Sequence, residues 1–201
     1  VQGSGNVGLG TVEILDRLGA KIVALTNSKG GAFNRRGLEL DQVRAAVTEG
    51  TPLGEITGAD AISNEELLGL DVDILVPAAL EGQITEGNAG KVKARLVAEG
   101  ANGPITPKGE DILLDAGVLV VPDILANAGG VGVSYFEWVQ DLQGFFWTAA
   151  EIDERLLGMM RKAFRDAWTV HKDEGCDLRT ACYMMAIARV ADAAKTRGVY
   201  P

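Results

Sequence analysis

The chain has 201 residues, of which 47% are hydrophobic and 23% charged, and its formal net charge at pH 7 is −9. This length fits one large domain or one domain with an appendage, and the hydrophobic fraction is sufficient for a buried core. The negative charge argues against a general nucleic-acid surface, and no hydrophobic run approaches the about 18 residues that a membrane span requires. Cys176 and Cys182 fit neither a disulfide framework nor a metal cluster, so we expect a reducing, cytoplasmic environment and no bound metal.

The first ten residues hold three glycines, Gly3, Gly5 and Gly8, at the spacing G-x-G-x-x-G. Between a strand and a helix, the first glycine of this pattern permits a tight turn and the second lets the backbone approach a pyrophosphate. The third lets helix and strand pack closely. A helical pattern over 7–18 and an apolar run at 22–25 follow, so the sequence predicts a β-α-β unit whose helix amides face the phosphates of a dinucleotide. The alternative is an ordinary glycine-rich turn that binds no ligand.

The sequence begins at Val1, directly before this turn, and has no initiator methionine. A complete first strand would need about five residues there. We therefore expect the chain to be the C-terminal portion of a longer polypeptide, truncated within its first strand.

Helical and strand patterns alternate from Val1 to Asp123. Helices are expected at 38–47, from the capping box Ser63-Asn64-Glu65-Glu66 onward, at 89–94 and at 108–116, and strands at 72–79, 118–123 and 95–104, the last running into a polar turn. This alternation is typical of the Rossmann type of α/β fold, a doubly wound, mostly parallel sheet with helices on both faces.

Ligands of such sheets bind at the carboxyl ends of the strands. After the second strand, Asn27 stands where an acidic residue would bond the ribose 2′-hydroxyl and repel a 2′-phosphate. Ser28 and Lys29 flank it, which favours tolerance of NADP, although a polar loop with a solvated lysine is an equal alternative. The small side chains of Ala78-Ala79 leave space for a ligand, or simply form a tight turn. The amide of Asn102 can bond a carboxamide, or serve as a turn asparagine before Gly-Pro.

The segment 124–138 combines a glycine pair, Gly129-Gly130, with several aromatic residues. We expect a tight turn at the glycine pair and an aromatic-rich helix after it. Asn127 and Ser134 are polar within this otherwise apolar run, and a packed turn in which both satisfy backbone groups would explain them without a ligand.

From Thr148 the composition changes. The capping box Thr148–Glu151 predicts the start of a long amphipathic helix, and Asp177 is expected to cap a final helix at 178–196. We therefore divide the chain into a dinucleotide-binding domain, residues 1–147, and a C-terminal helical segment, residues 148–201.

Short motifs spread over the whole chain resemble those of glutamate dehydrogenase, within the Glu/Leu/Phe/Val dehydrogenase family. They occur in the family's order: Val-Gln-Gly-Ser-Gly-Asn-Val-Gly (1–8), Ser-Lys-Gly-Gly (28–31), Pro-Ala-Ala-Leu (77–80), Glu-Gly-Ala-Asn-Gly-Pro (99–104), Pro-Asp-Ile-Leu-Ala-Asn-Ala-Gly-Gly-Val (122–131), Val-Ser-Tyr-Phe-Glu-Trp (133–138) and Leu-Arg-Thr-Ala (178–181). The block Asn-Ala-Gly-Gly-Val-x-Val-Ser is the most diagnostic, because a generic dinucleotide domain has no reason to carry it. The chain is similar to the coenzyme-binding domain and C-terminal helices of this family.

The resemblance implies a role for each matching residue. The coenzyme, NAD or NADP, would be bound by Gly3, Ser4, Gly5, Asn6, Val7, Gly8, Asn27, Ser28, Ala78, Ala79, Asn102 and Asn127. Residues 3–7 would hold the pyrophosphate, Asn27 and Ser28 the adenosine ribose, and Asn102 and Asn127 the nicotinamide end. The amino-acid pocket would be lined by Asn127, Val131 and Ser134, with Ser134 near the distal carboxylate of the substrate.

The activity that the resemblance implies for the parent enzyme is the reversible oxidative deamination of L-glutamate to 2-oxoglutarate and ammonia, with hydride passing to NAD or NADP. Asn27 replaces an acidic residue common at its site, so the coenzyme preference stays open. The family's catalytic lysine and aspartate belong to an N-terminal domain that is absent from this chain. We therefore assign no catalytic residue and expect the chain alone to be inactive, whereas the parent would be a homo-hexamer.

Two other hypotheses stay open. A leucine, phenylalanine or valine dehydrogenase of the same family would have apolar groups in place of those that bind the distal carboxylate, and Ser134 favours glutamate over these. A non-catalytic module that senses dinucleotides would need no substrate wall, and the block 127–134 argues against it.

Overall fold

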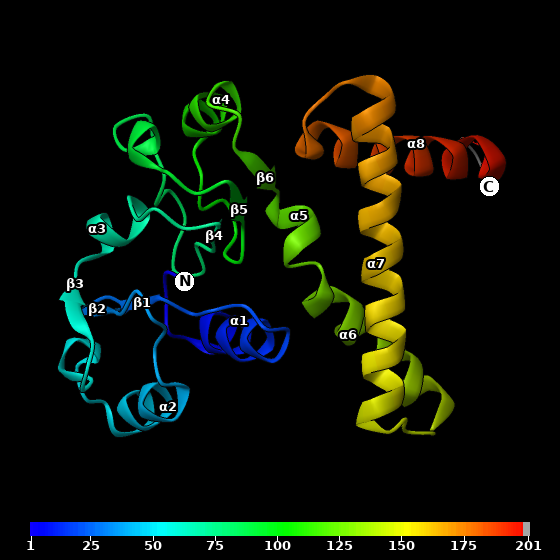
Figure 1. Cartoon of the computed structure of the whole chain (residues 1–201). Helices are drawn as coiled ribbons and strands as arrows, with labels where there is room; N and C mark the ends of the chain where they lie inside the picture. The colour runs from blue at the N-terminus through cyan, green and yellow to red at the C-terminus, as the bar shows by residue number, and fades with distance from the viewer. Residues whose placement is uncertain (199–201) are drawn as a thin grey trace. The chain divides into compact units, whose positions relative to one another are not determined.

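The computed structural model describes residues 1–198 and separates into two compact units, Val1–Val120 and the chain from Val121 onward. The first unit contains the strands, apart from Val121 at the end of β6, together with helices α1 to α4, and the second contains helices α5 to α8 (Figure 1). The sequence pattern instead predicts a boundary after residue 147. Contacts of α5 with α7 and α8, and of α6 with α7, account for the difference, because they join residues after Val121 to the C-terminal helices.

The predicted alternation of strands and helices is found in the first unit. Its helices are α1 (Asn6–Arg17), α2 (Leu40–Glu49), α3 (Asn64–Leu68) and α4 (Pro107–Asp115), with short 3-10 turns η1 (Leu53–Glu55) and η2 (Ala89–Lys91). Its strands are β1 (Ala24–Asn27), β2 (Gly30–Phe33), β3 (Asp60–Ile62), β4 (Ile74–Leu75), β5 (Leu96–Ala98) and β6 (Leu119–Val121).

Residues 1–3 form the centre of the sheet. Gln2 pairs in parallel with Thr26, at the end of β1, and with Pro77, just after β4. The Gln2 amide donates to the Val76 carbonyl at 2.8 Å, and the Gly3 amide donates to the Thr26 carbonyl at 2.9 Å. The central segment therefore joins the antiparallel ladder β1-β2-β3 to the ladder β4-β5-β6, in which β4 and β5 are parallel.

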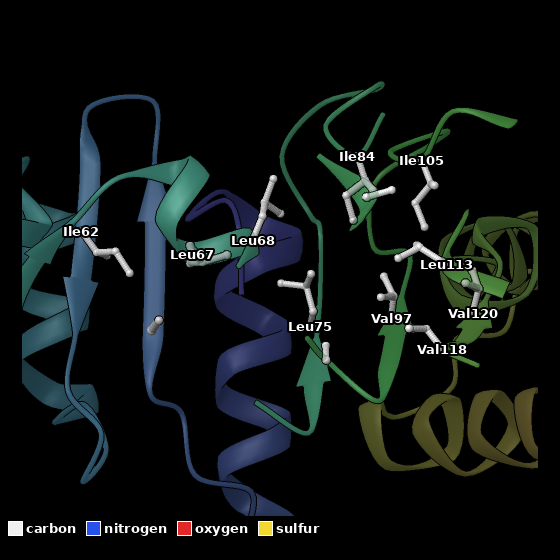
Figure 2. Packing of buried hydrophobic residues seen from close by; sticks show 13 residues of the cluster. Ile62, Leu67, Leu68, Leu75, Ile84, Val97, Ile105, Leu113, Val118 and Val120 are labelled. Carbon is white, nitrogen blue, oxygen red and sulfur yellow. The ribbon is translucent and has the colours of Figure 1, made fainter. Parts of the chain in front are cut away.

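Helices cover both faces of this sheet. Ala24 and Leu25 are neighbours in β1, so their side chains point to opposite faces. Leu25 belongs to an apolar cluster with Val12 of α1 and Val43 of α2. Ala24 belongs to a second cluster with Leu67 of α3 and residues of α4, and Figure 2 shows this cluster as side chains from β3 to β6, α3 and α4. The predicted doubly wound α/β fold is confirmed.

The segment after β1, for which the sequence left a polar loop as an alternative, is paired with the sheet. It is a hairpin in which Asn27 pairs with Gly30 across the two-residue turn Ser28-Lys29, and β2 runs antiparallel to β1. A side chain at Gly31 would place its Cβ 2.2 Å from the Leu25 carbonyl oxygen, so only glycine permits this close approach. Glycine is depleted in strands, which is why the sequence pattern indicates a loop here.

Three smaller differences concern predicted ends. The helix expected at 89–94 is the single 3-10 turn η2, and the strand expected at 72–79 has regular pairing only at Ile74–Leu75. The strand expected at 118–123 ends at Val121, because Pro122 precedes the first turn of a new helix, α5. Proline removes a backbone donor and suits a helix start, so it closes the strand.

Up to residue 198, the second unit forms four helices, α5 (Asp123–Ala126), α6 (Gly129–Gln143), α7 (Ala149–Glu174) and α8 (Leu178–Arg197). The glycine pair Gly129-Gly130, expected to form a tight turn, instead opens α6. The predicted capping box is present, since the Thr148 hydroxyl accepts from the Glu151 amide and Glu151 accepts from the Thr148 amide. Asp177 accepts a 2.8 Å bond from the Thr180 amide and so caps α8, as predicted.

Candidate coenzyme-binding site

The three glycines of the first turn have three different surroundings. Gly3 has a φ of +101°, and a Cβ there would lie 2.6 Å from the Ala78 carbonyl oxygen. A Cβ on Gly8 would lie 1.8 Å from the Gly3 carbonyl oxygen, so helix α1 packs directly on the central strand. Gly5 is exposed, and a Cβ there would meet nothing within 4 Å. The first and third glycines are thus required by the fold, whereas the second leaves open space in front of the backbone.

The open space lies at the start of α1. Gly5 is the N-cap residue with extended backbone, and no side chain caps the helix. The first turn has no acidic residue, and Asn6 and Val7 are exposed. The first amides of a helix have no partner within it, and the helix dipole is positive at this end. The start of this 12-residue helix therefore offers N–H donors and a favourable potential to an anion such as a pyrophosphate.

The ends of β4 and β5 converge on the same helix start. A Cβ on Gly100, just after β5, would lie 3.0 Å from the Ala78 Cβ and 3.4 Å from a Val7 methyl. The amides of Gly100 and Ala101 both donate to the Pro77 carbonyl at 3.0 Å, which holds the two strand ends together. The order of the strands in the sheet reverses at this place. From the central segment at Gln2, helix α1 leads to β1 on one side of that segment, whereas β4 lies on its other side. Open α/β sheets bind ligands in the crevice at such a point.

Three more of the residues predicted to bind the coenzyme lie at the same carboxyl end of the sheet. Ala79 follows Ala78 and is exposed, and Ser4 is half-buried inside the glycine turn. Asn102 is exposed in the turn after β5. The structure thus brings residues 3–8, the 78–79 pair and Asn102 to the carboxyl end of the sheet.

Asn27 and Ser28 lie at the end of β1, where the ribose of a dinucleotide is read. The Asn27 Oδ1 accepts a 2.8 Å hydrogen bond from the Lys29 amide, which shapes the hairpin turn. Behind the turn, Asn64 bonds both the Thr26 hydroxyl and the Asn27 carbonyl. Sequence reasoning missed this role of Asn64: the capping box around it predicts a helix start, but no local signal names a partner 37 or 38 residues away.

Gln2 is a second polar residue that sequence reasoning missed. Its side chain is only 1% exposed, and its Nε2 donates to the Gln83 Oε1 at 2.8 Å. This bond ties the central strand to the loop after β4. Gln2 stands directly before the glycine motif in the sequence, but only the pairing of the strands shows that it is buried.

The predicted substrate-wall residues lie within the second unit. Asn127 is the C-cap residue of α5, and its backbone amide donates to the Asp123 carbonyl at 3.0 Å. Val131 and Ser134 are three residues apart on α6, so they lie on neighbouring positions of one helix face. Both are exposed, Val131 by 77%. The first turns of α6 therefore present an apolar group and a hydroxyl side by side.

The sequence model of the family described as Glutamate/Leucine/Phenylalanine/Valine dehydrogenase matches residues 1–198 of this chain. The chain belongs to this dehydrogenase family. It is 54% identical over 203 residues to the glutamate dehydrogenase of Thermotoga maritima, covering 100% of this chain and 49% of that protein. It is also 44% identical to an NAD-specific glutamate dehydrogenase of Bacillus subtilis, with 98% and 46% covered, and 47% identical to NADP-specific glutamate dehydrogenase A1 of Halobacterium salinarum, with 100% and 49% covered.

Solved structures of the family agree with this fold. The hetero-hexameric glutamate dehydrogenase of Thermus thermophilus matches with a TM-score of 0.91 at 37% identity, over 100% of this chain and 47% of that one. The chain spans about half the length of the curated relatives it matches. The similarity to the family therefore covers about half of each of these relatives.

Two further findings concern metal ions and membrane spans. Within residues 1–198, no three histidine, cysteine or acidic side chains are grouped so that they would hold a metal ion. None of the helices in the described part of the chain has the length and hydropathy of a membrane span.

Proposed function

We propose that this chain is the coenzyme-binding part of an NAD(P)-dependent glutamate dehydrogenase. The parent reaction would be the reversible oxidative deamination of L-glutamate to 2-oxoglutarate and ammonia. The observation that carries the proposal is the glycine turn, where the fold requires Gly3 and Gly8 while Gly5 is exposed with no atom near its missing side chain. A packed structural turn has no need of such an opening at a helix start, whereas a pyrophosphate does.

The residues of the first unit would bind and orient the coenzyme, NAD or NADP. The amides of residues 3–7 would hold the pyrophosphate, and Gly8 would keep the helix close to the strand. Asn27 and Ser28 would contact the adenosine ribose, and the small Ala78 and Ala79 would border the dinucleotide. Asn102 and Asn127 would serve the nicotinamide end, since each amide offers both a donor and an acceptor. The bound nicotinamide supplies a carbon that accepts or donates a hydride.

The start of α6 would supply one wall of the amino-acid pocket. The exposed Val131 would contact the aliphatic part of the substrate, and the Ser134 hydroxyl would donate to its distal carboxylate. Asn127 would contact both ligands. We therefore propose the functional boundary after residue 147, with residues 148–201 as helical support.

The substrate wall has a direct test in the parent enzyme. Ser134→Ala is expected to raise the KM for glutamate about tenfold, since a hydrogen bond to a charged group contributes about 1.5 kcal/mol or more, while the KM for coenzyme stays unchanged. Ser134→Thr keeps the hydroxyl and is the matched control. An unaltered glutamate KM in Ser134→Ala would remove Ser134 from the proposed substrate wall.

Turnover would require groups from elsewhere in the protein. The donor and acceptor carbons must approach within about 3.5 Å, and positioned acid and base groups must handle the water and imine protons. No lysine of this chain matches the family's catalytic motif. The parent enzyme would be a cytoplasmic homo-hexamer, and light scattering on the parent protein would test that assembly.

The experiment that tests the proposal is a titration of NADH and NADPH with the 201-residue chain, followed by coenzyme fluorescence. We expect saturable binding of at least one of the two and no glutamate-dependent formation of reduced coenzyme. Absence of saturable binding at millimolar concentrations would overturn the coenzyme role. Glutamate turnover by the chain alone would overturn the proposed division of labour.

A further inference from the structure

The side chain of Asn64 joins two segments that are distant in sequence. Its Oδ1 accepts a 2.8 Å hydrogen bond from the Thr26 hydroxyl, and its Nδ2 donates a 2.8 Å bond to the Asn27 carbonyl. Thr26 has no exposed surface. Both bonds converge on the last two residues of β1, so one amide fixes the end of that strand.

Asn64 is itself held firmly. It is the first residue of α3, whose capping box is complete: the Ser63 hydroxyl accepts from the Glu66 amide, and Glu66 accepts from the Ser63 amide at 2.8 Å. These bonds from Ser63 hold the pKa of Glu66 below its usual value and keep the carboxylate charged. Leu67 and Leu68 of the same helix are buried in the core. The anchor behind the hairpin is therefore rigid on its core side.

The side-chain amide of Asn27, a half-buried residue, then has a defined chemistry. Its Oδ1 is occupied by the Lys29 amide at 2.8 Å. Within residues 1–198, the structure shows no hydrogen bond donated by its Nδ2, so two N–H donors remain for a ligand. Such donors bond a ribose hydroxyl or a phosphate oxygen, and the neutral amide lacks the charge with which an acidic residue repels a 2′-phosphate. The exposed Lys29 next to it adds a cation that favours the phosphate.

We propose that Asn64 is a positioning residue that sets the choice between NADP and NAD. It holds the Asn27 backbone so that the Asn27 amide meets the 2′ position of the adenosine ribose. The inference rests on the proposed coenzyme role of this chain. With Asn64 in place, NADPH binds at least as tightly as NADH. Without Asn64, the N–H donors of Asn27 are no longer oriented toward the 2′ position, and the affinity for NADPH falls relative to that for NADH.

The test compares the dissociation constants of NADH and NADPH for the 201-residue chain and its variants. Asn64→Asp keeps an acceptor for Thr26, but it loses the donor to Asn27 and adds a negative charge. It is expected to weaken NADPH about fivefold or more relative to NADH, the effect of losing about one hydrogen bond. Thr26→Val removes the other bond at nearly constant volume and should move the ratio in the same direction. Thr26→Ser keeps the hydroxyl and should leave the ratio unchanged.

The ratio of the two constants separates positioning from general stability. A residue that only stabilises the fold would weaken both coenzymes equally and leave the ratio unmoved, so a ratio within about twofold of wild type in both Asn64→Asp and Thr26→Val would overturn the inference. The two variants perturb the fold differently, and if only one of them folds, its ratio alone decides by the same twofold criterion. If the wild-type chain binds neither coenzyme, the proposed function fails first and the inference fails with it. If it binds them but the ratio does not move, only the inference fails.

Discussion

The glycine turn allows one substitution that separates coenzyme binding from folding, Gly5→Ala. Because a Cβ at Gly5 meets no atom within 4 Å and the backbone there is extended (φ −75°, ψ −172°), alanine fits the folded chain without strain. Alanine stabilises by about 0.4–1 kcal/mol through the unfolded chain, but it is a poorer N-cap than glycine by a similar amount. The two effects nearly cancel, so we expect the melting temperature to change by less than about 2 °C for a chain of this size.

Coenzyme binding should respond very differently to the same methyl group. The new side chain occupies the space in which a pyrophosphate would approach the helix amides, and each hydrogen bond to a charged group contributes about 1.5–3 kcal/mol. Loss of one such bond corresponds to at least about tenfold weaker NADH binding, measured by fluorescence titration. Wild-type affinity in a Gly5→Ala chain with an unchanged melting temperature would refute the assignment of this turn to the pyrophosphate.

The matched control is Gly8→Ala, one of the substitutions that the fold should not tolerate. Its Cβ would lie 1.8 Å from the Gly3 carbonyl oxygen, a backbone atom at the centre of the sheet that cannot rotate away. We expect a loss of more than about 3 kcal/mol in the free energy of unfolding, or no folded protein. Denaturant unfolding of the two alanine variants side by side tests whether the second and third glycines differ as the structure requires.

Four further predictions concern the second unit. Thr148→Ala is expected to lower the free energy of unfolding by about 1 kcal/mol, the usual cost of losing an N-cap. The Thr148 amide and hydroxyl lower the pKa of Glu151 below its ordinary 4.5, so the stabilisation from Glu151 is present above pH 4.5 and is lost as the pH falls further. The difference in melting temperature between the wild type and Glu151→Gln should therefore disappear in acid. A difference that does not depend on pH would contradict this. Arg179→Met removes the 2.9 Å bond between Arg179 and Asp123, a pair only 20% and 16% exposed, and should cost about 2–4 kcal/mol in urea unfolding, whereas a loss below about 1 kcal/mol would mark the pair as energetically unimportant. Partial burial raises the pKa of the Cys182 thiol, so its alkylation at pH 8, followed on its peptide by mass spectrometry, should be slower in the folded chain than in urea; equal rates would contradict this effect.

Local signals predicted much of this fold because the physics behind them is local. Each capping box needs only two residues three apart, and both are complete in the structure, at Ser63 and at Thr148. Helix α1 and its glycine turn were predicted for the same reason, since Gly3 and Gly8 act on atoms only a few residues away or on the adjacent strand. The doubly wound fold then follows from the alternation of such units.

The hairpin β1-β2 and the start of α6 depend on contacts that no local pattern contains. Gly30 and Gly31 indicate a loop by propensity, yet β2 lies between β1 and β3, where tertiary pairing outweighs the glycine penalty. The glycine pair before Val131 likewise indicates a turn, but it forms the first turn of α6. Gly132, just after it, faces α7 so closely that a Cβ would lie 2.2 Å from the Met159 methyl. Gly31 thus permits close packing against the backbone of β1, and Gly132 lies against the flexible end of the Met159 side chain.

The candidate site shows the same division between local and long-range information. The glycine spacing and the position of Asn27 near the end of β1 were readable in the sequence, because the chain itself sets the order of turn, helix and strand. The anchoring of Asn27 by Asn64 was not, since it requires α3 to pack beside β1. The coenzyme preference therefore could not be derived from the identity of Asn27 alone. What Asn27 can bind depends on which of its atoms already form hydrogen bonds within the fold.

The net charge of −9 illustrates why composition limits some functions and not others. A surface that binds nucleic acid must attract phosphates over its whole length, so a net negative charge opposes it. A dinucleotide is recognised within a few ångströms, and at physiological salt charges beyond about 8 Å are largely screened. At that range the relevant groups are the first amides of α1, the two N–H donors of Asn27 and the cation of Lys29, none of which carries a negative charge. The acidic character of the whole chain is therefore compatible with the proposed binding of an anion at its first turn, because the local arrangement of groups decides the ligand.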